Sequence, residues 1–250
     1  MQVIILFFLL YNLYMYNKYT LEIPQMDYLL GSLVSIILVL FLFLLILHIR
    51  LYVYYKGLIL QKFPKKHYSE CTHKIKSGDV ILFRSHKYNF PSCFQMYFND
   101  TPYSHAGVIY RKNQELYIVE AHPNHYCNRG TSCQGVRIYP LKDRIHKYQG
   151  TVLIKHLLYD LQKDIHDRYD HFVRNYKNYP YFPSNPGMFF NYLNRCYLGR
   201  KTTFPLNCTE LVAYVFKNVL KLGIVDNEGC AHPGTFDETE YFGPAYKIVI

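Results

Sequence analysis

The sequence predicts an α+β domain, with an antiparallel sheet packed on helices, that follows an N-terminal transmembrane region. Residues 29–47 form an apolar run without a single charge. Beyond about residue 74, short runs typical of strands alternate with two helical patterns. Half of the 250 residues are hydrophobic and 18% are charged, so the chain has enough apolar surface to bury a core.

The run at 29–47 (LLGSLVSIILVLFLFLLIL) is apolar on every side of a helix. Its length matches the roughly 20 residues that cross a hydrocarbon core of about 30 Å. A second apolar run, 3–16, is shorter and contains Asn12. It could form a first membrane span, which would give two passes, or it could lie outside the membrane, which would leave one. The chain start lacks the positive charge and the cleavage site of a secretory signal. We therefore expect a transmembrane region over 1–50 with one or two passes.

The formal charge of +10 lies entirely beyond residue 50, because residues 1–50 carry two basic and two acidic side chains. Residues 51–73 are expected to be a basic juxtamembrane linker, with a helix that leaves the bilayer and ends at Pro64. The basic flank predicts that the rest of the chain faces the cytosol. Seven irregularly spaced cysteines also favour a reducing compartment. We expect an integral membrane protein with its basic face toward anionic lipid, and no nucleic-acid partner, because no binding motif accompanies the charge.

Residues 74–250 are predicted to form the α+β domain. Strands are expected at 79–84, 106–110, 116–121, 135–138, 151–156 and 247–250, and helices at 157–176 and 209–222. Asp79 follows the turn Ser77-Gly78, and its expected role is in turn geometry.

The second helix opens with a cysteine. Asn207 is a favoured N-cap, and Glu210 completes a capping-box pattern. Cys208 then lies at the first helical position, where the helix dipole is expected to lower the pKa of its thiol. The Cys208 N–H could also hold a developing oxyanion. Taken alone, this element favours a small buried cysteine without chemistry, because nothing in it supplies a base.

A histidine opens the strand in YSHAGVIY. If the following turn is Lys112-Asn113, His105 stands opposite Glu120 on one face of a hairpin. Glu120 would then orient the imidazole and leave its other nitrogen for a thiol. On spacing alone, a cross-strand pair without a catalytic role is about as compatible with the sequence. A one-residue slip of the pairing register would place the two side chains on opposite faces.

Four motifs, SGDVILFR, TPYSHAGVIY, YIVEAHP and NCTELVAYVF, follow one another along about 75–250. In this order they resemble the permuted papain-like amidases of the YaeF/YiiX family, in the NlpC-type superfamily, which has bacterial and large-DNA-virus members. The resemblance implies a catalytic set of Cys208 (nucleophile), His105 (general base and acid) and Glu120 (which orients the histidine). It implies cleavage of a peptide or isopeptide bond through an acyl-enzyme, with no cofactor. Ser104 and Thr209 flank this set and are expected to lie near the substrate.

Two other functions remain open. Lipid-acting thiol acyltransferases or phospholipases of the lecithin-retinol-acyltransferase-like type share the histidine-before-cysteine order and a membrane anchor. They usually carry a second histidine where this chain has Glu120, which favours the amidase. A catalytically silent membrane scaffold that kept the fold is the other alternative.

The segment after the Glu120 strand contains four potential zinc ligands: His122, His125, Cys127 and Cys133. Their spacing matches no recognised zinc finger or ribbon, so a polar loop is the favoured interpretation. We assign no metal, and whether these side chains bind one is left open.

Overall fold

The structure is a computed structural model that describes residues 25–122, 135–161, 164–176, 207–225 and 231–250. The chain divides into two compact units, Met1–Arg50 and Leu51–Ile250, which are described separately.

The first described element is α2 (Gln25–Leu60), which contains the apolar run predicted at 29–47. Within the described residues, one helical stretch, Gly31–Leu60, is long and apolar enough to cross a membrane. Its large apolar side chains between Leu33 and Ile49 are exposed, as expected of a helix that faces lipid. The possible first span at 3–16 lies outside the described residues.

The second unit is built on a sheet of seven strands in the order β1-β7-β6-β2-β3-β4-β5. Neighbouring strands pair antiparallel except β1 and β7, which are parallel. The strands are β1 (Lys65–His67), β2 (Val80–Ser85), β3 (His105–Lys112), β4 (Glu115–His122), β5 (Gly135–Pro140), β6 (Gly150–Lys155) and β7 (Tyr246–Val249). All six predicted strands are present, so the expected α+β class is confirmed.

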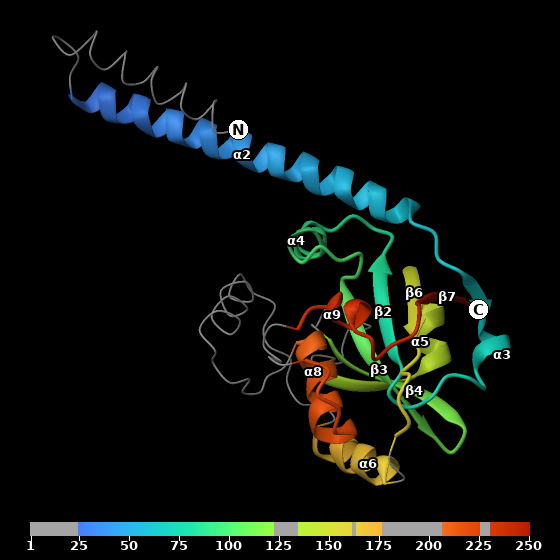
Figure 1. The fold of residues 1–250 in the computed structure, drawn as a ribbon. Helices are drawn as coiled ribbons and strands as arrows, with labels where there is room; N and C mark the ends of the chain where they lie inside the picture. The colour runs from blue at the N-terminus through green and yellow to red at the C-terminus, as the bar shows by residue number, and fades with distance from the viewer. Residues whose placement is uncertain (1–24, 123–134, 162–163, 177–206, 226–230) are drawn as a thin grey trace. The chain divides into compact units, whose positions relative to one another are not determined.

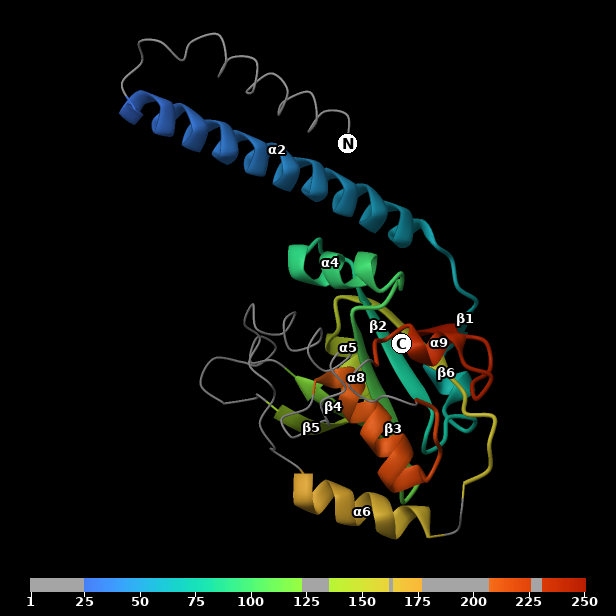
Figure 2. The same cartoon turned by 60° about the vertical axis from the view of Figure 1, so that its left-hand side comes forward.

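Helices cover both faces of this sheet (Figures 1 and 2). They are α3 (Tyr68–Cys71), α4 (Phe90–Phe98), α5 (Leu141–Lys147), α6 (Ile165–Tyr176), α8 (Cys208–Tyr214) with its wider continuation η2 (Val215–Leu220), and α9 (Thr235–Glu238). One core lies between the sheet and α6, α8 and η2. A second core, with α3 and α5, lies on the opposite face, because successive strand residues point to alternate faces.

The segment expected to be a linker, 51–73, is an ordered part of the second unit. Leu51 and Tyr55 of α2 are buried there, and β1 adds a strand to the sheet. The helix α2 ends at Leu60, before the expected stop at Pro64.

The helix predicted over 157–176 begins only at Ile165. The reason is that Leu157 pairs with Phe242, and its N–H donates to the Asp79 carboxylate at 2.9 Å. These contacts keep the chain extended beyond β6 and prevent a helix there.

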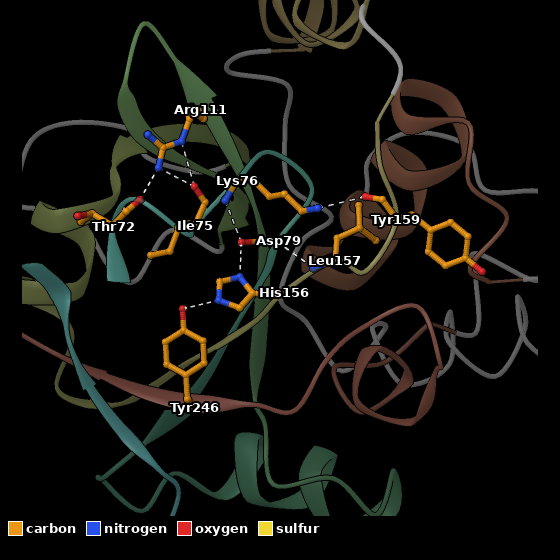
Figure 3. A network of polar contacts seen from close by, with 9 residues as sticks. All are labelled: Thr72, Ile75, Lys76, Asp79, Arg111, His156, Leu157, Tyr159 and Tyr246. Atoms are coloured by element: carbon orange, nitrogen blue, oxygen red, sulfur yellow. Dashed lines mark hydrogen bonds and ion pairs between the residues drawn. The ribbon is translucent and has the colours of Figure 1, made fainter. Parts of the chain in front are cut away.

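The same carboxylate joins three parts of the sheet (Figure 3). Asp79 is fully buried and also accepts the Lys76 N–H at 2.9 Å. Its Oδ2 lies 2.8 Å from Nδ1 of His156, whose Nε2 is 3.1 Å from the Tyr246 hydroxyl. Asp79 therefore does more than shape a turn, because it connects the start of β2 to the end of β6 and to β7.

Candidate active site

The predicted capping box fixes Cys208 at the start of α8. The Asn207 side chain accepts the N–H groups of Thr209 at 3.0 Å and Glu210 at 2.9 Å. In return, the Glu210 carboxylate accepts the Asn207 N–H at 3.1 Å. Cys208 is thus the first residue of the helix, and the helix packs on β3 and β4.

The hairpin that carries His105 and Glu120 has a different register from the predicted one. Val108 pairs with Val119, and the turn residues are Asn113 and Gln114, both with positive φ. Positive φ at both central residues is typical of a type I′ hairpin turn. The predicted pairing was wrong by two residues, an even number, so His105 and Glu120 still share a face, as diagonal neighbours.

The two side chains form a close pair. Nε2 of His105 lies 2.7 Å from Oε2 of Glu120, whose side chain is fully buried. The other carboxylate oxygen accepts a hydrogen bond of 2.6 Å from Nε of Arg144, and Nη2 of Arg144 lies 3.3 Å from Oε2. Arg144 comes from α5, and the sequence analysis assigned it no role.

The His105–Glu120 pair and the helix α8, which carries Cys208, lie on opposite faces of the sheet. His105 and Glu120 lie on the face covered by α5, whereas α8 packs on the opposite face. The two meet at the start of β3. There the backbone of Ala106 lowers the pKa of the Cys208 thiol, and pairing of β3 with β4 begins only two residues later, at Val108.

These contacts place Cys208 near the start of β3. The Ile109 N–H donates to the backbone carbonyl of Asp79, the residue just before β2, and N–H groups alternate sides along a strand, so the Ala106 N–H points toward β4. Cys208 therefore lies beside the start of β3, near Ala106, the residue that follows His105.

The electrostatics of Cys208 differ from the expected thiolate. Burial raises the pKa of its thiol to about 11, and the negative charge of Glu120 acts in the same direction. The N–H groups of Ala106 and Thr209 lower the pKa by less than burial raises it. The expectation that the helix start makes this thiol acidic was wrong, because desolvation of the charged form outweighs the amide dipoles. The resting group is a neutral thiol.

Ser104 and Thr209 are both hydrogen-bonded within the protein. The Ser104 hydroxyl donates to the Phe83 carbonyl at 3.3 Å. The Thr209 hydroxyl donates to the Ala231 carbonyl at 2.7 Å, and Thr209 is 2% exposed. These contacts hold loops beside the site, and proximity of the two hydroxyls to a substrate stays a prediction.

Of the four potential zinc ligands, His125, Cys127 and Cys133 lie outside the described residues, and His122 ends β4. Among the residues that the structure does describe, no three His, Cys, Asp or Glu side chains are grouped so that they could hold a metal ion.

Comparisons with known proteins give distant similarities. No family model matches the chain. Uncharacterized protein R372 of Acanthamoeba polyphaga mimivirus is 27% identical in an alignment of 118 residues, with a coverage of 40% of this chain and 46% of that protein. The chain thus matches less than half the length of that relative. The solved structure of the metalloprotein yiiX from Escherichia coli O157:H7 covers 67% of this chain and 94% of its own, with a TM-score of 0.47 and 16% identity.

Proposed function

We propose that this protein is a membrane-anchored cysteine hydrolase that cleaves an amide bond, peptide or isopeptide, in a permuted papain-like domain. The observation that carries the proposal is the 2.7 Å contact between His105 and buried Glu120, next to Ala106, whose backbone lowers the pKa of the Cys208 thiol. A thiol, an imidazole and a carboxylate are the parts of a nucleophilic triad, and the proposal requires the first two to come together during the reaction.

The chemistry starts from a neutral thiol. Glu120 engages Nε2 of His105, so Nδ1 is the nitrogen that takes the thiol proton while the sulfur attacks the substrate carbonyl. The backbone N–H of Cys208 donates to the oxyanion that develops on the carbonyl oxygen. The carbon–nitrogen bond then breaks, and the imidazolium returns its proton to the leaving amine.

Water completes the cycle. His105 takes a proton from water, the hydroxide adds to the thioester, and the carbon–sulfur bond breaks to release the acid and restore the thiol. Each step moves a proton between the imidazole and one partner, so the cycle needs no cofactor.

A lipid-acting thiol acyltransferase or phospholipase is the second candidate. The exposed apolar surface of α2 favours it, since a helix of this kind would keep the domain near lipid. The same nucleophile would then attack an ester, and lipid products would distinguish this function from the first.

The test uses the full chain in detergent micelles, with panels of peptide amides, isopeptides and phospholipids. The proposal expects amide cleavage, an acyl adduct on the Cys208 peptide by mass spectrometry, and loss of both in Cys208→Ala. Cys93→Ala is the matched control, because Cys93 is also a buried free thiol but lies in α4. Lipid products alone would favour the second candidate. Products from neither panel, with no adduct on Cys208, would support a silent scaffold.

A further inference from the structure

The carboxylate of Glu120 has a second partner that the triad alone does not explain. Arg144 contacts both of its oxygens, through Nε to Oε1 at 2.6 Å and through Nη2 to Oε2 at 3.3 Å. Oε2 is also the oxygen that contacts His105. The arginine side chain is 11% exposed and the glutamate fully buried, so the contact is shielded from solvent.

Two aromatic rings hold the guanidinium in place. Its central carbon lies 4.6 Å from the ring centre of Phe83 and 5.2 Å from that of Tyr148. The Phe83 ring also lies 5.3 Å from the imidazole of His105. A planar guanidinium that packs against two rings and makes two hydrogen bonds to one carboxylate has little rotational freedom.

The charges around the imidazole come from several elements. Glu120 on β4 is negative, and Arg144 on α5 is positive. Cys208 on α8 is neutral at rest. On β5, Arg137 lies opposite Glu120 in the strand pairing, and Tyr139 lies two residues further along the same strand. The carboxylate that faces the imidazole therefore has the positive charge of Arg144 beside it. This favours the unprotonated base that a neutral thiol requires.

We propose that Arg144 is a positioning residue of the site, which holds both oxygens of Glu120 so that the carboxylate orients His105 without keeping the imidazole protonated. The proposal rests on the proposed function, in which His105 must accept a proton from Cys208. Arg144 itself touches neither the nucleophile nor the substrate.

The test follows the titration of His105 by NMR of the full chain in micelles with labelled histidine, using His105→Ala to assign the signal. In Arg144→Gln the buried carboxylate loses its balancing charge, so the imidazole takes up its proton about one pH unit higher than in the wild type. Arg144→Lys keeps the charge and titrates near the wild type. Lys142→Gln is the matched control, because it removes a positive charge from an exposed position of the same helix.

A second readout covers the case in which Arg144→Gln does not fold. Arg144→Lys cannot bridge both oxygens in the plane of a guanidinium, so alkylation of Cys208 at pH 7 is expected to slow several-fold while Lys142→Gln reacts like the wild type. If the His105 titration is unchanged in Arg144→Gln, the proposal is overturned. If Arg144→Gln is unfolded, unchanged alkylation of Cys208 in Arg144→Lys would overturn it instead. The NMR titration needs no substrate, so it gives a result even if the hydrolase assignment fails.

Discussion

At the scale of single residues, the candidate site depends on which of its side chains are charged and which are neutral. The Cys208 thiol is buried and neutral at rest, and the Glu120 carboxylate, whose charge also raises its pKa, contacts His105 and Arg144. Such a site holds the proton on sulfur until a base removes it during attack. The reactivity of Cys208 should therefore come from the imidazole and not from a preformed thiolate.

The buried contacts of Asp79 lead to a prediction about the stability of the fold that does not involve the candidate site. Asp79→Asn puts an amide NH₂ group against N–H donors from Lys76 and Leu157, so at least one buried polar group loses its partner. We expect a loss of about 2–4 kcal/mol in the free energy of unfolding, measured by urea denaturation.

The control is Asp167→Asn on α6, which removes an exposed carboxylate and should change the free energy of unfolding by less than about 0.5 kcal/mol. Equal effects of the two substitutions would mean that the Asp79 network adds nothing to stability.

At the scale of elements, the N-cap of α8 is expected to affect both the stability of the fold and the reactivity of Cys208. Asn207→Ala removes the acceptor of two backbone N–H groups, which should cost about 1 kcal/mol and loosen the residue that follows it, Cys208. We expect slower alkylation of Cys208 at pH 8, measured by peptide mass spectrometry, together with a lower unfolding midpoint.

The structure offers a matched cap for comparison. Asn89 caps α4 by accepting the Ser92 N–H at 3.2 Å. Asn89→Ala should lower the unfolding midpoint to a similar extent and leave Cys208 alkylation unchanged. If both variants slow the alkylation equally, the effect is general loosening and not a property of the α8 cap.

The sequence predicted those elements whose signals are local. The capping box at Asn207 and the shared face of His105 and Glu120 depend on short spacings, and both are present. The hairpin register was missed by two residues because either turn, Lys112-Asn113 or Asn113-Gln114, fits the same alternation of faces.

Arg144 was missed because its role depends on a contact between distant segments. It lies in a seven-residue helix whose apolar side is only Leu141 and Ile145, too short for a clear helical period. An arginine beside those two residues, on the buried side of the helix, is the signal that could have found it. Its partner Glu120 is 24 residues away, and a single sequence does not show that pairing.

At the scale of the whole molecule, the two compact units predict where the chain can be divided. A chain of residues 51–250 keeps Leu51, Tyr55 and β1, so it should unfold cooperatively and stay out of the membrane fraction, in which we expect the full chain. A chain of residues 74–250 loses these buried groups and one strand, and should be markedly less stable. Circular dichroism melts and membrane fractionation measure both effects.

Three comparisons would contradict this division. Equal stability of the two truncated chains would mean that residues 51–73 are a linker, as the sequence suggested. Membrane association of residues 51–250 equal to that of the full chain would mean that the apolar helix is not the anchor. Loss of structure in both truncated chains would mean that the second unit does not fold alone.

The most direct test of the account compares alkylation of Cys208 by iodoacetamide across pH in the wild type and in His105→Ala, with Cys71 and Cys93 of the same chain as internal references. Burial raises the pKa of both reference thiols, so they should react slowly at neutral pH. The account predicts rapid labelling of Cys208 near pH 7 in the wild type. In His105→Ala, labelling of Cys208 should become fast only as the pH approaches about 11, the pKa of its buried thiol. Superimposable pH profiles for the two proteins would contradict the assignment of His105 as the base.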